Sequence, residues 1–149
     1  MTALLIRSLV PADRAAWEPL WHDYLAFYKT TVPAEIYDMT FARLTGGDAD
    51  MAAFVATGAN GDFLGIVHTI QHRHCWKIEK VIYLQDLFTV PAARGRGVAR
   101  ALIEKVYAYA DSMGAPHVHW LTAEDNYAGR MLYDKVGRRG PFIRYTRPL

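Results

Sequence analysis

The stretch that decides the fold has the sequence LQDLFTVPAARGRGVARAL and covers residues 84–102. Its first part is apolar almost throughout, as in a strand covered on both faces, and its last part has the apolar spacing of an amphipathic helix. A short turn rich in arginine and glycine joins the two. Such a turn directs free backbone N–H groups and the positive end of a helix dipole at one point in space. It therefore predicts a binding site for an anion, and for a phosphate above all.

Two glycines and two arginines give this turn its binding character. Gly95 and Gly97 let the backbone approach a ligand closely, and Arg94 and Arg96 add positive charge beside it. A P-loop would need Lys followed by Ser or Thr after the last glycine, but valine and alanine follow Gly97. A dinucleotide-binding fingerprint would need Gly or Ala where Arg100 stands. A tight turn without any ligand is the remaining alternative.

The composition is typical of one globular domain, which we expect to span residues 1–149. This length is enough to bury a core, and no window approaches the roughly 18 consecutive apolar residues of a membrane helix. The single cysteine and the lack of a secretory signal pattern favour the cytoplasm. The net charge of +2 is too small to indicate nucleic acid. Eight of the twelve arginines lie in residues 94–147, which suits a polyanionic ligand, although solvated surface arginines would give the same count.

Periodicity and turn residues predict a mixed α/β sheet of about six or seven strands with helices on both faces. Residues 58–61, Gly-Ala-Asn-Gly, are typical of a hairpin turn and disfavour a purely parallel sheet. The expected strands cover residues 4–10, 51–57, 62–72, 80–90, 117–121 and 142–145. The expected helices run from Pro11 to about Tyr28, from about Ile36 to Leu44, from Val98 to Ala110 and from Asn126 to about Val136.

Three histidines recur at even offsets before the central strand. An unbroken strand would place His68, His72 and His74 on one face, and three imidazoles could bind zinc. Apart from the nearby Cys75, the sequence offers no fourth ligand at a recognised spacing. We therefore expect no metal, and we interpret the histidines as a wet strand face or the rim of a substrate pocket, where one of them could relay protons.

Several segments together resemble the GCN5-related N-acetyltransferases (GNAT). Residues 94–99, RGRGVA, resemble the acetyl-CoA signature of that family, and residues 83–88, YLQDLF, resemble its central strand. Residues 126–137, NYAGRMLYDKVG, resemble its Asn-x-x-Ala-x-x-Leu-Tyr-x-x-x-Gly segment. The ending PFIRY at residues 141–145 is similar to that of fungal histone and D-amino-acid acetyltransferases, whose near relatives act on spermidine and thialysine.

The resemblance implies a splayed GNAT sheet and direct transfer of an acetyl group from acetyl-CoA to a primary amine. The acceptor would be a small amine, an amino acid or a polyamine, with a protein lysine also possible. The pyrophosphate of acetyl-CoA would lie on the turn, and its pantetheine arm would pair with the central strand. Asn126 matches a position that contacts this arm, and it is also a helix N-cap. The implied binding residues are Leu87, Phe88, Thr89, Arg94, Gly95, Arg96, Gly97, Val98, Ala99, Arg100, Asn126 and Tyr133.

Tyr133 matches the general acid of the family. Its spacing of seven residues from Asn126 independently places both side chains on one helix face, although a core aromatic would have the same spacing. A base is also needed, because alkyl ammonium groups are protonated near pH 7. Several relatives carry Glu where this chain has Gln85, which cannot accept a proton. Asp86 and Glu124 are the remaining candidates, and for Asp86 a buried, hydrogen-bonded carboxylate is the alternative role.

Three further expectations follow from the resemblance. Trp21, Tyr24, Phe27 and Tyr28 belong to a helix that lines the acceptor pocket in this family, although core packing alone would explain most of them. We also expect a homodimer, formed through the C-terminal strands. The rival functions are a noncatalytic acyl-CoA sensor or interaction module on the same fold, and a metal-dependent hydrolase that would use the three histidines.

Overall fold

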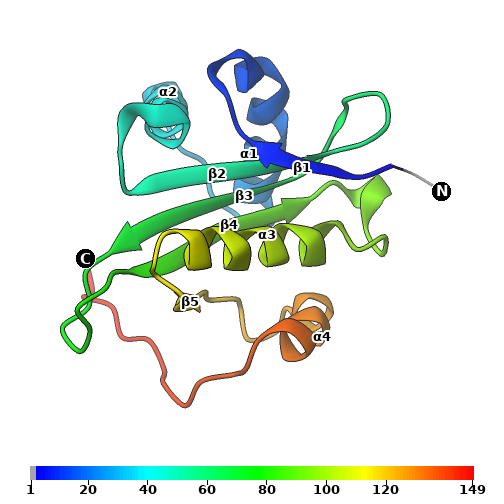
Figure 1. Cartoon of the computed structure of the whole chain (residues 1–149). Coiled ribbons are helices and arrows are strands. Elements are labelled where there is room, and N and C mark those ends of the chain that lie inside the picture. Colours follow the sequence, from blue (N-terminus) through cyan, green and yellow to red (C-terminus); the bar gives the residue numbers. More distant parts are fainter. Residues whose placement is uncertain (1–2) are drawn as a thin grey trace.

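The computed structural model describes residues 3–149, which form a five-stranded sheet flanked by helices on both faces (Figure 1). The strands are β1 (Leu5–Ser8), β2 (Met51–Thr57), β3 (Phe63–His72), β4 (Val81–Thr89) and β5 (Val118–His119). The helices are α1 (Arg14–Phe27), α2 (Ala34–Ala42), α3 (Val98–Ser112) and α4 (Tyr127–Val136), with short helical turns η1 (Pro11–Asp13), η2 (Arg43–Gly47) and η3 (Pro91–Ala93).

The sheet is mixed, as the sequence predicts. Its order is β1-β2-β3-β4-β5, and the first four strands are antiparallel while β5 runs parallel to β4. The last pair is short, because only Ile82 with Val118 and Tyr83 with His119 are joined. Beyond Tyr83 the two strands separate, which leaves one edge of β4 without a strand partner among the described residues.

A β-bulge interrupts β4 at Gln85. His68 of β3 pairs with Asp86 and the next residue, Thr69, pairs with Leu84, so Gln85 is the extra residue. A bulge of this kind reverses the alternation of side chains along the strand. Leu84 therefore packs in the core on the α3 side of the sheet, whereas Asp86 contacts α1 on the opposite side.

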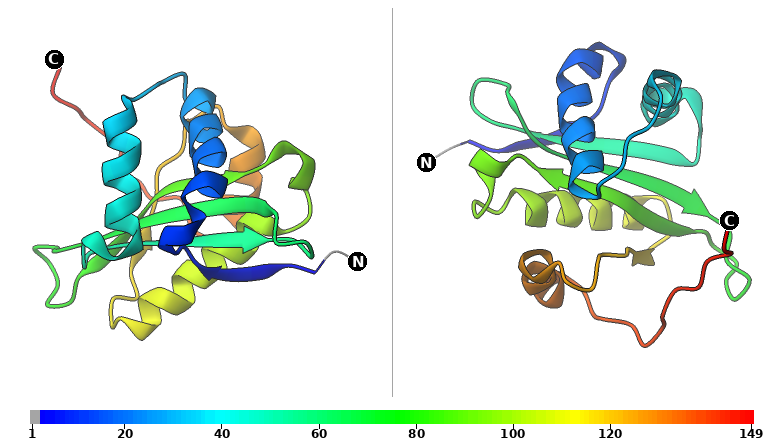
Figure 2. Two further views of the ribbon diagram at one scale, coloured as in Figure 1. Left: turned by 90° about the horizontal axis from the view of Figure 1, so that it is seen from above. Right: turned by 180° about the vertical axis from the view of Figure 1, so that it is seen from behind.

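Two cores hold the layers together, one on each face of the sheet (Figure 2). On one face, α1 and α2 cover β2 and β3, and Trp17 of α1 is completely buried there. On the other face, α3 packs along the sheet through a fully buried stripe that includes Leu102 and Val106. Burying side chains of this size stabilises the fold by about 1.5–3 kcal/mol each. These two cores fix β4 and the start of α3 relative to each other.

The expected last strand is not formed. Residues 142–145 have no sheet partner among residues 3–149, and Phe142, Ile143 and Tyr145 are 84%, 79% and 88% exposed. The segment runs away from α4 past β5, outside the sheet (Figure 1). The alternation of apolar residues alone does not make a strand, because the segment passes outside the sheet without pairing to any of its edges. Separately, no helix in the described part of the chain is long and apolar enough to cross a membrane.

Candidate functional site

A cavity of about 550 Å³ opens where β4 ends, between the N-terminus of α3 and the first turns of α4. It is lined by every residue of the expected acetyl-CoA set except Arg96. The sequence analysis missed several other lining residues: Ala93, Ala128, Gly129, Leu132 and Lys135. The spacing argument could not have found Lys135, because residues two apart, such as Tyr133 and Lys135, do not share a helix face.

The arginine- and glycine-rich turn shapes one end of this cavity. Gly95 and Gly97 have φ values of +77° and +81°, the left-handed region that costs other residues roughly 1–2 kcal/mol. Nothing lies within 4 Å of the place where a Cβ would stand on either residue. The turn therefore needs glycine for its backbone torsions and not for space. Gly97 is the N-cap of α3 and supplies no side-chain cap, so the first N–H groups of this helix stay free for a ligand.

The arginines of the turn have different positions. Arg94 lies on the cavity wall, where its Nε donates to the Thr89 carbonyl at 3.2 Å and its guanidinium lies 5.7 Å from the centre of the Phe88 ring. Arg100 also lines the cavity and pairs with Glu104 one helical turn on, at 3.1 Å. Arg96 differs from the expectation: its Nη2 donates to the Ala92 carbonyl at 2.6 Å, which holds the side chain on the turn.

The wall formed by β4 leaves polar groups available to a ligand. Because β5 has separated from this edge, the backbone of Leu87, Phe88 and Thr89 lines the cavity without a neighbouring strand. The Thr89 hydroxyl is buried there and has no hydrogen-bond partner among residues 3–149. An extended, amide-bearing ligand arm fits this wall.

Helix α4 presents Asn126 and Tyr133 to the cavity, as their spacing predicts. Asn126 caps the helix: its Oδ1 accepts from the Gly129 N–H at 3.3 Å and its Nδ2 donates to the Thr122 hydroxyl at 2.9 Å. Burial, with a smaller contribution from Tyr28, raises the pKa of Tyr133 to about 12. The Tyr133 phenol therefore holds its proton at neutral pH and can donate it.

A much smaller hollow adjoins the cavity near the bulge. Tyr28, Leu87 and Tyr133 line both spaces, so the two meet at these side chains. The remaining walls of the hollow are Tyr24, Leu84, Gln85, Trp120 and Leu121. The aromatic residues expected to line the acceptor pocket lie in α1 or directly after it. Three of them line one or both spaces, namely Tyr24, Phe27 and Tyr28, while Trp21 is buried in the core.

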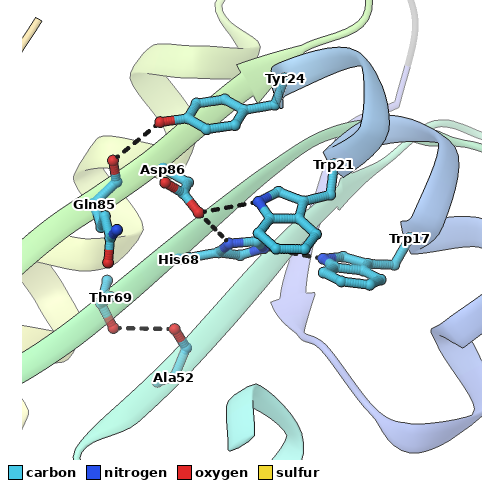
Figure 3. A network of polar contacts seen from close by, with 8 residues as sticks. All are labelled: Trp17, Trp21, Tyr24, Ala52, His68, Thr69, Gln85 and Asp86. Atoms are coloured by element: carbon cyan, nitrogen blue, oxygen red, sulfur yellow. Dashed lines mark hydrogen bonds and ion pairs between the residues drawn. The ribbon is translucent and has the colours of Figure 1, made fainter. Parts of the chain in front are cut away.

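A buried polar network lies directly under the bulge (Figure 3). Asp86 Oδ2 is 2.8 Å from His68 Nδ1 and accepts from Trp21 Nε1 at 3.2 Å. Trp17 Nε1 donates to His68 Nε2 at 3.0 Å. Because Nε2 accepts this bond, the network assigns the imidazole proton to Nδ1, which donates to Asp86. The Tyr24 hydroxyl donates to the Gln85 carbonyl at 3.3 Å, just above this network.

These contacts decide the role of Asp86. Burial alone would raise its pKa, but the hydrogen bonds from His68 Nδ1 and Trp21, with a contribution from the nearby Tyr24 hydroxyl, lower the pKa overall. A carboxylate held this firmly in its charged form is a poor proton acceptor at neutral pH. The alternative role, a buried hydrogen-bonded carboxylate, is the one that the geometry supports.

The other base candidate and the histidine set do not reach the site as expected. Glu124 is exposed and lines neither space, and its backbone carbonyl accepts a bond from Arg130. His68 is enclosed beneath α1, whereas His72 turns toward His119 of β5. His68 and His72 lie four residues apart on β3, about 13 Å at the usual rise of a strand, and His74 follows the end of β3. Within residues 3–149 no three potential metal ligands come together.

The comparisons with known proteins agree with this geometry. The family model described as "Acetyltransferase (GNAT) family" matches residues 15–137. The chain belongs to this family. D-amino-acid N-acetyltransferase HPA3 of Saccharomyces cerevisiae is 36% identical to it over 145 residues, which are 97% of this chain and 90% of that protein. Aminoglycoside N(6')-acetyltransferase type 1 of Stenotrophomonas maltophilia is 31% identical over 121 residues, covering 76% of this chain and 71% of that protein.

A solved structure supports the fold assignment. Aminoglycoside N-acetyltransferase AAC(6')-Iy in complex with CoA superimposes with a TM-score of 0.85 at 18% identity, covering 99% of this chain and 96% of that one. The GNAT fold and the acetyl-CoA-dependent N-acetyltransferase activity predicted from the sequence are thereby confirmed. The residues that carry the reaction and the identity of the amine are a separate question.

Proposed function

We propose that this N-acetyltransferase binds acetyl-CoA in the 550 Å³ cavity and acetylates the primary amine of a small acceptor, with an amino acid as the first candidate. The observation that carries the proposal is the continuity of the phosphate turn, the unpaired edge of β4 and Tyr133 along one cavity. The amino-acid class is favoured by the likeness to HPA3 over nearly the whole chain. Polyamines are less favoured, because carboxylates do not line either space.

The chain offers matched groups for each part of the coenzyme. The free N–H groups at Gly97 and the start of α3, with Arg94 and Arg100, suit the pyrophosphate. The open edge of β4 at Leu87 and Thr89 suits the amide groups of the pantetheine arm. When bound, acetyl-CoA supplies an acetyl group activated as a thioester.

The reaction then depends on two kinds of donor. Backbone N–H groups freed where β4 leaves β5 are placed to bond the carbonyl oxygen as negative charge develops on it. Tyr133 lines both the cavity and the hollow, and its hydroxyl would give its proton to the departing sulfur. The acceptor amine would approach from the hollow, past Tyr24 and Gln85.

A panel of amines tests the proposal directly. Thiol release from acetyl-CoA would be measured with D-alanine, D-phenylalanine, their L-enantiomers, spermidine, kanamycin and a lysine-containing peptide. Turnover of an amino acid above the polyamine and the peptide is expected, together with acetyl-CoA binding in calorimetry. Acetyl-CoA binding without turnover of any amine would instead favour the acyl-CoA sensor. If calorimetry gave no heat of binding, the cavity would not be the acetyl-CoA site.

A further inference from the structure

Two imidazoles meet beside the point at which β4 and β5 separate. His72 at the end of β3 and His119 at the end of β5 have their Nε2 atoms 3.0 Å apart. His72 Nδ1 lies 2.8 Å from the Arg73 carbonyl. The His119 ring also stacks on Tyr83, with 5.0 Å between ring centres and 3° between ring planes. The position of His119 is thus fixed by contacts to two strands.

The hydrogen bonds assign the protons of this pair. A carbonyl oxygen only accepts, so His72 must carry its proton on Nδ1 and present the lone pair of Nε2. His119 must then donate from Nε2, which leaves its Nδ1 with a free lone pair. A base whose distal nitrogen donates to a second group is oriented in the way that catalytic triads orient their histidine. Here the Arg73 carbonyl and His72 supply that orientation.

The pair lies on the acceptor side of the sheet. Tyr83, on which His119 stacks, is close enough to Tyr24 and Tyr28 to contribute to raising the pKa of both. The two residues after His119, Trp120 and Leu121, line the hollow together with Gln85. Gln85 is two residues beyond Tyr83 along β4, or about 7 Å at the usual rise of a strand. His119 itself lines neither space, and one water covers only about 5.6 Å, so a short chain of water molecules would connect it to the hollow.

We propose that His119 Nδ1 accepts the proton of the acceptor ammonium through bridging water, and that His72 is the residue that positions it. The inference rests on the proposed function. It supplies a general base, a role that Gln85 cannot perform and to which the buried, hydrogen-bonded Asp86 is poorly suited. The ammonium loses one proton to the water as the water passes one to Nδ1, giving a neutral amine and an imidazolium. The amine nitrogen then bonds the acetyl carbon, the carbon–sulfur bond breaks, and the sulfur takes the Tyr133 proton. The nitrogen then loses a second proton, which reprotonates the Tyr133 oxygen. His119 releases its proton to solvent.

The surroundings of His119 keep its imidazole unprotonated at neutral pH. Burial, followed by His72 and His74, lowers its pKa, so the ring is free of the proton before the acceptor arrives. The groups that face it are His72 of β3, His74 after that strand and Tyr83 of β4. No carboxylate of residues 3–149 contributes to the shift. The stacked Tyr83 ring then stabilises the imidazolium once it forms.

The test compares pH profiles of kcat/KM for the best acceptor of the amine panel. His119→Gln removes the base, and we expect at least a 30-fold loss at pH 7, with activity rising as pH approaches the pKa of the free amine. His72→Phe keeps an aromatic ring but cannot accept the hydrogen bond that His119 Nε2 donates. The acid limb of the pH profile should therefore shift. His117→Gln is the matched control, because His117 is exposed on the same stretch and its side chain makes no hydrogen bond among the described residues.

The outcomes separate this inference from the proposed function. Acetyl-CoA affinity and melting temperature should stay unchanged in His119→Gln and His117→Gln. If His119→Gln keeps more than a third of the wild-type kcat/KM with the same acid limb, His119 is not the proton acceptor, while the proposed function stands. If the wild-type enzyme releases no thiol with any amine, the proposed function fails, and this inference fails with it.

Discussion

His68 Nδ1 and Asp86 Oδ2 lie 2.8 Å apart at the rung where the register of β3 and β4 shifts. The pair joins the bulge to α1, because Trp21 donates to the same carboxylate oxygen. The bulge in turn precedes the stretch of β4 that lines the cavity. The packing of α1 therefore determines the position of backbone groups at the site.

Tyr133→Phe tests the proton donor. The ring keeps its T-shaped contact with Trp120 at 5.6 Å, so the fold should be unaffected. We expect kcat to fall by about 100-fold or more, because positioned acids contribute that much to proton-transfer steps. Thiol release measures the fall, and calorimetry should give an acetyl-CoA affinity within about twofold of wild type. A variant as fast as wild type would show that another group, or water, protonates the sulfur.

Gly97→Ala tests the turn, with Gly114→Ala as its matched control. Both glycines have positive φ, +81° and +64°, and open space where a Cβ would stand. Each variant should therefore lose about 1–2 kcal/mol of unfolding free energy. Gly97 lies on the cavity and Gly114 does not, so acetyl-CoA affinity should fall markedly in Gly97→Ala alone. Calorimetry and urea unfolding measure the two quantities, and equal affinity losses would contradict the assignment.

Local patterns predict most of this fold. The bounds of β2 and β3 agree with expectation within one residue, because a Gly-Ala-Asn-Gly turn and apolar runs specify a hairpin locally. Helix α4 begins after Asn126 and ends before Gly137, since both caps are short-range signals. The strand at 142–145 is wrong, because strand formation depends on a partner edge that alternation does not encode. The expected strand at 117–121 shortens to Val118–His119 for the related reason that β5 must leave β4 to open the site.

The candidate site, like the fold, has one part that local sequence patterns predict and another part that they do not. The phosphate turn and the spacing of Asn126 and Tyr133 are contiguous in sequence, so their side of the cavity is predictable. The pair of His72 and His119 joins residues 47 apart, and no local pattern indicates it. Strand parity does relate His68 and His72, because β3 carries no extra residue, but the two lie about 13 Å apart along the strand and β3 ends before His74.

Asp86→Asn tests the buried network through pH. A lowered carboxyl pKa adds stability that is complete above the unfolded pKa near 3.8 and is lost as pH falls through the folded value. Wild-type unfolding free energy should therefore drop as pH falls below about 4. Asp86→Asn should lose about 1.5–3 kcal/mol at pH 7 and show a shallower drop, as urea unfolding can measure.

Two comparisons test whether the loss of stability is specific to Asp86. Asp38→Asn removes an exposed ion pair with Arg14 and should cost under about 1 kcal/mol. The acid sensitivity that persists in Asp86→Asn should come in part from Asp13, whose pKa is lowered by its hydrogen bond to Arg7. If Asp86→Asn unfolds with the wild-type pH dependence, the His68–Asp86 contact adds no stability.

The exposed C-terminal segment predicts a homodimer. Phe142, Ile143 and Tyr145 leave apolar surface in water, and the alternating pattern suits pairing with an open sheet edge of a second copy. Light scattering should give twice the 16.8 kDa chain mass, and Phe142→Ser with Ile143→Ser should shift the protein to monomer. Met113→Ser, which changes an exposed apolar residue at the end of α3, should leave the dimer intact. A wild-type monomer at every concentration tested would mean that the segment remains unpaired, as it is within one chain.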